Sequence, residues 1–201
     1  AWDIHHVMGG WQNAFHHAAF TVSTTMSSTG FATADFDLWP SFSKHIILVL
    51  MLLGAMAGST GGGMKTSRLV LLFKQLKANM RQTLRPRSVQ VVHMNGRPVS
   101  DKVLQGLNAY MAAYWIIIFI SILLLSLNEM PMESNISAVF SCFNNIGPGF
   151  QLVGPMCNYG HLNDVSKIVL ILDMLLGRLE IFPILALLSG SHWQRRAMKR
   201  A

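Results

Sequence analysis

Apolar positions form one uninterrupted run in this chain, and glycines or charged residues interrupt the others. Residues 106–127 carry no charge and are rich in Ile and Leu, and a helix of that length crosses about 30 Å of hydrocarbon. Residues 166–189 form a second long run that contains Asp173, Arg178 and Glu180. Both patterns predict membrane-spanning helices. Because charge at that depth is costly, the second run is also a candidate functional element.

A third apolar run leads into a glycine-rich segment, residues 58–63. Residues 45–57 are strongly apolar but too short to span a membrane, and helical character resumes at residues 64–77. One continuous helix over residues 45–80 would be about 54 Å long, and each central glycine would cost about 1 kcal/mol. The pattern predicts a helix that is broken within the membrane. Irregular backbone is tolerated at that depth only where it is buried or lines a wet cavity.

Two shorter segments, residues 12–27 and 134–144, are compatible with helices but are too short or too polar to span a membrane. Each ends in a glycine-containing turn. We call residues 28–31 the first glycine turn and residues 145–150 the second glycine turn. Half-helices that enter a membrane and return as extended backbone are typical of re-entrant pore loops.

The order of these elements repeats along the chain. Leu50-Met51-Leu52-Leu53-Gly54 matches Leu172-Asp173-Met174-Leu175-Leu176-Gly177, and each match follows a half-helix, a glycine turn and an acidic loop. We therefore expect an all-α membrane protein of about one and a half helix–pore-loop–helix repeats, with further sequence upstream. The expected parts are a repeat without its first helix, a basic loop, a complete repeat and a basic tail: residues 1–80, 81–105, 106–190 and 191–201.

The distribution of charge supports a membrane location. Only 12% of the residues are charged, against about 25% in soluble domains. Most Lys and Arg lie in residues 74–102 and in the tail, whereas residues 32–44, 128–133 and 151–167 are acidic. This alternation places the basic segments in the cytoplasm and argues against a nucleic-acid partner despite the net charge of +7. Within the basic loop, β-branched residues before Asn95-Gly96 predict a small hairpin.

The two glycine turns are candidate cation sites. A cation that crosses a membrane exchanges its hydration shell for oxygens, and backbone carbonyls supply them without net charge. Gly30 and Gly147 permit backbone angles that side chains disfavour, and each preceding half-helix aims its partly negative C-terminal end at the turn. One such turn is an ordinary structural feature, whereas two at equivalent positions favour a pore.

The glycine-rich segment invites comparison with a phosphate-binding loop, but Met64 stands where that motif requires Lys, and an apolar helix precedes it. A gate below the glycine turns is favoured over a loosely packed kink. Arg178 lies on nearly the opposite helical face from Asp173 and Glu180, so it cannot pair with either within its own helix. Two roles remain open for Arg178, a structural tie between helices and a fixed positive charge beside the pathway.

Two histidine pairs, His5-His6 and His16-His17, raise a different class of function, a membrane-bound metalloenzyme with histidine ligands. Pairs eleven residues apart on one helix would lie about 16 Å from each other, which is too far for one metal ion. We therefore predict no transition-metal site, no catalytic residue and no enzyme activity. Cys142 and Cys157 do not make a disulfide framework, and both are expected to be small buried residues.

Four motifs carry a family resemblance: Ser-Thr-Gly-Phe-Ala-Thr at 28–33, Gly-Ser-Thr-Gly-Gly-Gly-Met-Lys at 58–65, Phe-Asn-Asn-Ile-Gly-Pro-Gly at 143–149 and Met-Leu-Leu-Gly-Arg-Leu-Glu-Ile-Phe-Pro at 174–183. Over nearly its whole length the chain resembles the bacterial TrkH-type potassium uptake proteins of the Trk/Ktr/HKT superfamily. In that family, four helix–pore-loop–helix repeats of potassium-channel type surround one pore. This chain looks like the third repeat without its first helix, followed by the whole fourth repeat.

The resemblance implies roles for the residues of both turns and of the glycine-rich segment. Potassium would bind through backbone carbonyls of a filter formed by Ser28, Thr29, Gly30, Asn145, Ile146 and Gly147. An intramembrane gate would consist of Gly58, Ser59, Thr60, Gly61, Gly62 and Gly63, with Arg178 nearby.

The resemblance also implies potassium uptake across the bacterial inner membrane and assembly as a homodimer. Expected partners are the remaining N-terminal repeats of the same polypeptide, the lipid bilayer and a cytosolic nucleotide-binding regulatory subunit of the TrkA type. Potassium is the expected substrate, and no cofactor is expected. A sodium-permeable relative of the same family is the alternative, and channel-like transport and ion-coupled symport both stay open. Two repeats cannot close a four-sided filter, so this chain is not expected to conduct alone.

Overall fold

The computed structural model describes residues 1–54, 56, 58–59, 61–85, 87, 91–179, 181 and 183. Within this part, every regular element is helical except one hairpin of two short strands. In chain order the elements are α1 (Trp11–Met26), η1 (Phe36–Leu38), α2 (Ser41–Leu53), α3 (Thr66–Leu84), β1 (His93–Met94), β2 (Arg97–Pro98), α4 (Asp101–Ser126), α5 (Met132–Phe143), η2 (Gln151–Val153), η3 (Tyr159–His161) and α6 (Asp164–Leu179).

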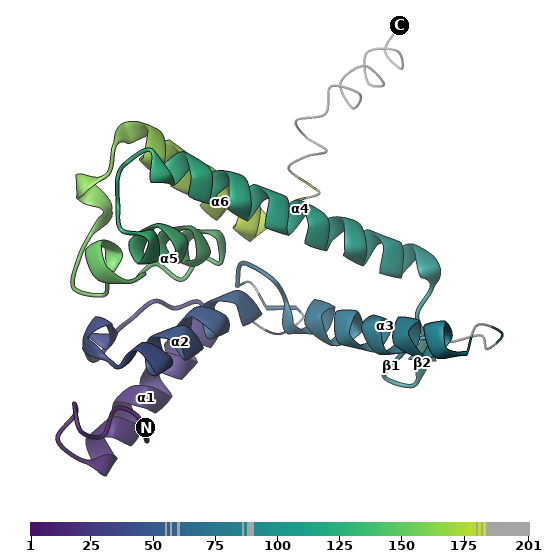
Figure 1. The fold of residues 1–201 in the computed structure, drawn as a ribbon, viewed down its shortest axis with the longest axis horizontal. Helices are drawn as coiled ribbons and strands as arrows, with labels where there is room; N and C mark the ends of the chain where they lie inside the picture. The colour runs from purple at the N-terminus through teal and green to yellow at the C-terminus, as the bar shows by residue number, and fades with distance from the viewer. Residues whose placement is uncertain are drawn as a thin grey trace, which may run out of the picture.

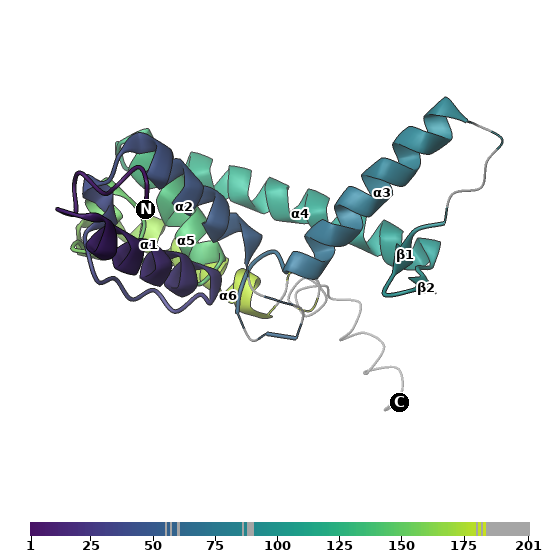
Figure 2. The same cartoon turned by 90° about the horizontal axis from the view of Figure 1, so that it is seen from below.

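The helices form two packed groups that meet at α5. In Figure 1, α4 and α6 lie side by side with α5 against them, and α1 lies beside α2. Helix α2 also contacts α5, which joins the two groups. Helix α3 leads away from α2 and lies near the N-terminal part of α4 (Figure 2). There the Arg68 guanidinium lies over the Tyr110 ring, 4.0 Å from its centre.

Each group of helices has its own buried apolar cluster. One cluster joins side chains of α4, α5 and α6, among them Tyr114, Ile118 and Phe143. The other joins the N-terminal segment, α1 and α2. Ile146 and Phe150 of the second glycine turn belong to this second cluster. The second glycine turn therefore packs against the group that contains the first.

Helix α4 is the one helix among the described residues whose length and composition suit a membrane span. Helix α2 is equally apolar in character but has only 13 residues. It ends at Leu53, where Gly54 has a φ of 60°, and α3 begins at Thr66. The break predicted from the glycines is present, but α2 ends earlier than the apolar pattern of residues 45–57 predicts.

The remaining elements lie near their predicted positions. The predicted half-helices correspond to α1 and α5. Helix α2 begins directly after Pro40, and α5 begins directly after Pro131. Proline suits this position because it has no backbone N–H that would need a hydrogen-bond partner. The strands β1 and β2 pair antiparallel across Asn95-Gly96, where the sequence predicts a hairpin. The end of the predicted run 166–189 and the tail 191–201 lie outside the described residues.

Candidate functional site

The first and second glycine turns share an unusual backbone conformation. Ser28 and Gly30 have φ values of 54° and 81°, and Asn145 and Gly147 have φ values of 56° and 113°. Non-glycine residues rarely adopt positive φ, yet each turn contains one, two positions before its glycine. The sign of φ thus alternates in the same way in both turns. In an extended strand all φ values are negative and successive carbonyls point to opposite sides. The positive φ values in the turns change the directions of these carbonyls.

The helices before the two turns also end alike. In each case one amide donates to the carbonyl three residues earlier, and the next amide donates to the carbonyl five residues earlier, which closes the C-terminal end of the helix. The donor–acceptor pairs are Ser28–Thr25 at 3.2 Å, Thr29–Thr24 at 2.9 Å, Asn145–Cys142 at 3.0 Å and Ile146–Ser141 at 2.9 Å. Two segments far apart in the sequence therefore share one local structure.

The two turns are in direct contact. A Cβ atom added to Gly30 would overlap the carbonyl oxygen of Ile146 and would lie 3.4 Å from the Pro148 ring. Beside them, the Phe36 and Phe150 rings pack edge to face with centroids 5.7 Å apart. The structure therefore brings Gly30 of the first turn against Ile146 and Pro148 of the second turn.

Three serines on one face of α5 hold the chain that returns from the second turn. Their spacing of three and then four residues places them on one side of a helix, and all three are buried. Each hydroxyl accepts a backbone amide: Gly147 N donates to Ser141 Oγ at 3.0 Å, Phe150 N to Ser137 Oγ at 2.9 Å and Leu152 N to Ser134 Oγ at 3.4 Å. Sequence reasoning missed these serines, although buried hydroxyls at helical spacing were a visible signal.

The glycine-rich segment lies against the C-terminal end of α5. Gly63 N donates to the Gly177 carbonyl at 3.4 Å, and a Cβ atom at Gly63 would overlap the Asn144 side chain. A Cβ atom at Gly62 would lie 2.6 Å from the Asn145 amide nitrogen. Gly62 and Gly63 of the predicted gate are therefore next to the residues that begin the second turn. Thr60 of the predicted gate lies outside the described residues.

Two polar residues of α6 have opposite environments. Asp173 is 2% exposed, and its Oδ1 accepts a hydrogen bond of 2.8 Å from Ser121 of α4. Arg178 is exposed, and no hydrogen bond or ion pair to its guanidinium is found among the described residues. The opposite faces predicted for Asp173 and Arg178 agree with this difference. Glu180 lies outside the described residues.

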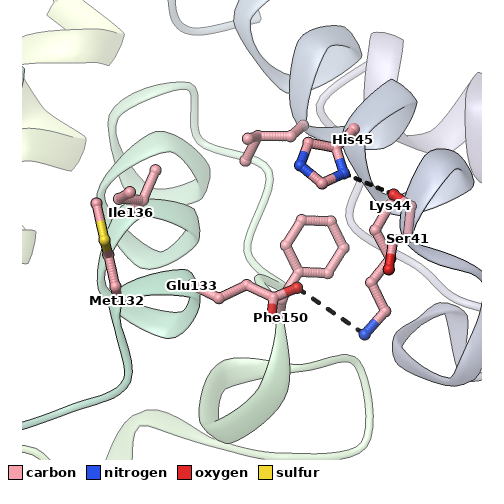
Figure 3. A pocket seen from close by; sticks show the side chains of 8 residues that line it. Ser41, Lys44, His45, Met132, Glu133, Ile136 and Phe150 are labelled. Carbon is pink, nitrogen blue, oxygen red and sulfur yellow. Dashed lines mark hydrogen bonds and ion pairs between the residues drawn. The ribbon is translucent and has the colours of Figure 1, made fainter.

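A cavity of about 430 Å³ lies between α2 and α5 at the end where both helices begin (Figure 3). Lys44 enters it from α2, 3.0 Å from Asp37 and 3.9 Å from Glu133 at the start of α5. Gln151 Nε2 donates to the second Glu133 oxygen at 2.6 Å. This small ion-pair group links the segment after the first turn to the helix before the second.

The rings within each histidine pair are in contact, and the two cysteines differ in burial. The His5 and His6 rings are tilted by 44° with centroids 3.6 Å apart, and the His16 and His17 rings pack edge to face with centroids 5.2 Å apart. In the described part of the chain, no three His, Cys, Asp or Glu side chains gather into a group that could hold a metal ion. Cys142 is buried as expected, but the prediction for Cys157 is wrong because its side chain is exposed.

Comparison with known proteins gives consistent matches over most of the chain. The family model described as TrkH, a cation transport protein, matches residues 5–198. The Trk system potassium uptake protein TrkH of Vibrio parahaemolyticus is 35% identical over 190 residues, which cover 94% of this chain and 39% of that protein. TrkG of Escherichia coli K12 is 33% identical over 181 residues, covering 90% of this chain and 37% of that protein.

A solved structure agrees with these matches. The crystal structure of the potassium transporter TrkH from Vibrio parahaemolyticus aligns with a TM-score of 0.84 at 35% identity, covering 94% of this chain and 40% of that one. This chain thus spans about two fifths of the length of these relatives. They are transport proteins, in agreement with the prediction that the chain is not an enzyme. On these matches, this mostly helical chain belongs to the TrkH family of cation transport proteins.

Proposed function

We propose that the two glycine turns form two sides of a potassium filter within a longer membrane protein that takes up potassium. The observation that carries the proposal is the pairing of the turns, which have the same pattern of φ and meet at Gly30 and Ile146. The proposed ligands are backbone carbonyls of the two turns: Ser28, Thr29 and Gly30 of the first, and Asn145, Ile146 and Gly147 of the second.

The electrostatics of the two turns suit a cation. Each turn directly follows the C-terminal end of a helix, α1 or α5, which is the partly negative end of the helix dipole. Carbonyl oxygens replace the hydration shell of a cation without adding a fixed charge. A full carboxylate would hold the ion more tightly, whereas conduction requires that the ion also leave.

The glycine-rich segment and Arg178 are the proposed gate. Gly62 and Gly63 lie against Asn144 and Asn145, directly beside the second turn. Arg178 follows Gly177, whose carbonyl accepts the Gly63 amide. A positive charge near this contact would repel a cation that leaves the filter, and movement of the glycine-rich segment would open or close the path.

The rest of the proposal concerns the longer protein. The relatives named above are called potassium uptake proteins, which supports potassium as substrate and the bacterial inner membrane as location. Four repeats around one pore, with repeats at residues 1–80 and 106–190 here, would complete the filter. Assembly as a homodimer and docking of a TrkA-type regulatory subunit on the basic cytoplasmic loop and tail are further parts of this proposal.

Substitution of Gly147 by Ala in the full-length transporter tests the filter assignment. Gly147 has a φ of 113° and open space around its Cβ position, so an added methyl group strains the backbone without a steric overlap. We expect a lower ratio of potassium to sodium uptake in a bacterium that lacks its own potassium uptake systems. The matched control is Gly96→Ala, because Gly96 of the hairpin also has positive φ and open space.

Both substitutions strain the backbone, but only Gly147 lies in the proposed filter, so the pair distinguishes a general effect of strain from an effect on the filter. A reduced ratio in Gly147→Ala and an unchanged ratio in Gly96→Ala supports the filter assignment. Unchanged selectivity in Gly147→Ala removes this residue from the filter. A parent transporter that takes up sodium as readily as potassium favours the sodium-permeable alternative.

A further inference from the structure

Both polar backbone groups of Gly147 are bound by side chains. Its amide donates to Ser141 Oγ at 3.0 Å, and its carbonyl oxygen accepts a hydrogen bond of 2.7 Å from the Tyr159 hydroxyl. Tyr159 comes from η3, twelve residues beyond the glycine. One side chain from the pore-loop helix and one from the later loop therefore fix this peptide from two sides.

The residue of the first half that is equivalent to Tyr159 carries no hydroxyl. A short 3-10 helix precedes the inner helix in both halves, η1 before α2 and η3 before α6. Each begins with the same cap, since Asp35 accepts the Asp37 amide and Asn158 accepts the Gly160 amide. The residue after each cap is Phe36 in the first half and Tyr159 in the second.

These two aromatic residues contact the turns in different ways. Phe36 is buried and packs against Phe150 and Trp39. It has no group that could donate a hydrogen bond. Tyr159 is only partly buried, and its hydroxyl reaches the Gly147 carbonyl. The equivalent position therefore supplies packing alone in the first half of the chain and a directed hydrogen bond in the second.

The Tyr159 hydroxyl keeps its proton under ordinary conditions. Burial raises the pKa of this phenol well above its usual value, and the nearby Cys142 thiol acts in the same direction. A neutral phenol donates one hydrogen bond, and the short distance to the carbonyl oxygen is that of a well-formed O–H···O bond. The contact is therefore a hydrogen bond that the neutral phenol donates to the Gly147 carbonyl oxygen.

We propose that Tyr159 is a positioning residue that determines potassium selectivity by fixing the direction of the Gly147 carbonyl. The inference rests on the proposed filter and deepens it. The Gly147 carbonyl oxygen has two lone pairs, so it can accept the Tyr159 hydrogen bond and still face a cation. A carbonyl held by this hydrogen bond turns less easily toward a smaller cation, which keeps the second turn at a spacing suited to the larger ion. Among the described residues, no side-chain hydroxyl donates to a carbonyl of the first turn in the same way. Selectivity therefore depends more on the second turn than on the first.

The test is Tyr159→Phe in the full-length transporter, which removes one oxygen and keeps the ring. Loss of a hydrogen bond worth about 1 kcal/mol predicts a potassium-to-sodium uptake ratio lower by about fivefold. The ratio does not depend on how much protein reaches the membrane, so reduced folding alone leaves it unchanged. Ser43→Ala is the matched control, because Ser43 also donates a 2.7 Å hydrogen bond, to Asp3 and away from the turns.

A second variant acts on the other side of the same peptide. Ser141→Ala removes the acceptor of the Gly147 amide and should lower the ratio in the same direction. An unchanged ratio in Tyr159→Phe overturns the role of Tyr159, whatever Ser141→Ala does. If Gly147→Ala changes selectivity and Tyr159→Phe does not, the filter stands and this inference fails. If neither changes it, the filter assignment itself fails.

Discussion

Helices α2 and α6 contain nearly the same apolar sequence before a glycine, yet they behave differently at that glycine. Helix α2 ends at Leu53, and Gly54 takes a φ of 60°. Helix α6 continues through Gly177 to Leu179. After Gly54 the chain is rich in glycine, whereas Gly177 is followed by Arg178 and Leu179, which favour a helix. The residues that follow decide whether the helix ends.

Gly54 and Gly177 each make a close contact that requires the absence of a side chain. A Cβ atom at Gly54 would lie 2.5 Å from the Met64 carbonyl oxygen, at the far end of the glycine-rich segment. A Cβ atom at Gly177 would overlap the Phe143 carbonyl at the end of α5. One half of the molecule thus supplies a folded-back segment, and the other supplies a continuous helix against which that segment rests.

The largest effect is expected from Gly177→Ala in the full-length protein. Because the new methyl group overlaps the Phe143 carbonyl, α6 must move away from α5, and such overpacking costs about 1–3 kcal/mol. The thermal unfolding midpoint of the purified transporter measures this loss. Gly106→Ala in α4 is the control, since nothing lies within 4 Å of its Cβ position. It should be neutral or stabilise the helix by up to about 1 kcal/mol. Equal effects of the two substitutions would contradict the contact.

An intermediate effect is expected from shortening the glycine-rich segment. Deletion of Gly61 and Gly62 should raise cation flux severalfold, because a shorter segment cannot lie across the end of α5. Uptake of potassium per transporter in the membrane is the measurement. Deletion of two residues from the hairpin turn, Asn95 and Gly96, serves as the control for a shortened loop. Flux that is unchanged or reduced counts against a gate at this place.

The smallest effect is expected at the junction between the two halves. Lys44→Met removes the ion pairs to Asp37 and Glu133, whose side chains are partly exposed, and such pairs contribute about 0–1 kcal/mol. The unfolding midpoint should fall slightly. Lys167→Met is the comparison, because Lys167 lies 3.7 Å from the exposed Asp164 within one helix. A larger loss from Lys167→Met would mean that Lys44 does not link the halves.

Much of the candidate site could be predicted because its signals are local. Apolar periodicity and length located α1 and α5 to within two residues at each end, whereas α4 begins five residues earlier than predicted. Glycine content located the break after α2. The repeated motif placed Gly30 and Gly147 at equivalent positions. These features depend on residues close together in the chain, for which backbone preferences and hydrophobic pattern are informative.

Other features depend on contacts between distant segments, which a single sequence does not specify. The serines of α5 are ordinary helix residues until the returning chain presents its amides to them. Tyr159 is one aromatic residue in a loop until its hydroxyl meets the Gly147 carbonyl. Cys157 was expected to be buried because of its residue type, but its loop leaves it exposed.

The sequence by itself determined the helices, the two glycine turns and the family of the chain, because these follow from composition, periodicity and motifs. Only the tertiary structure decided that the turns touch, that α6 passes unbroken through Gly177, and which side chains hold the second turn. The physical reason is that hydrogen bonds and close packing between distant segments depend on distances that folding alone creates.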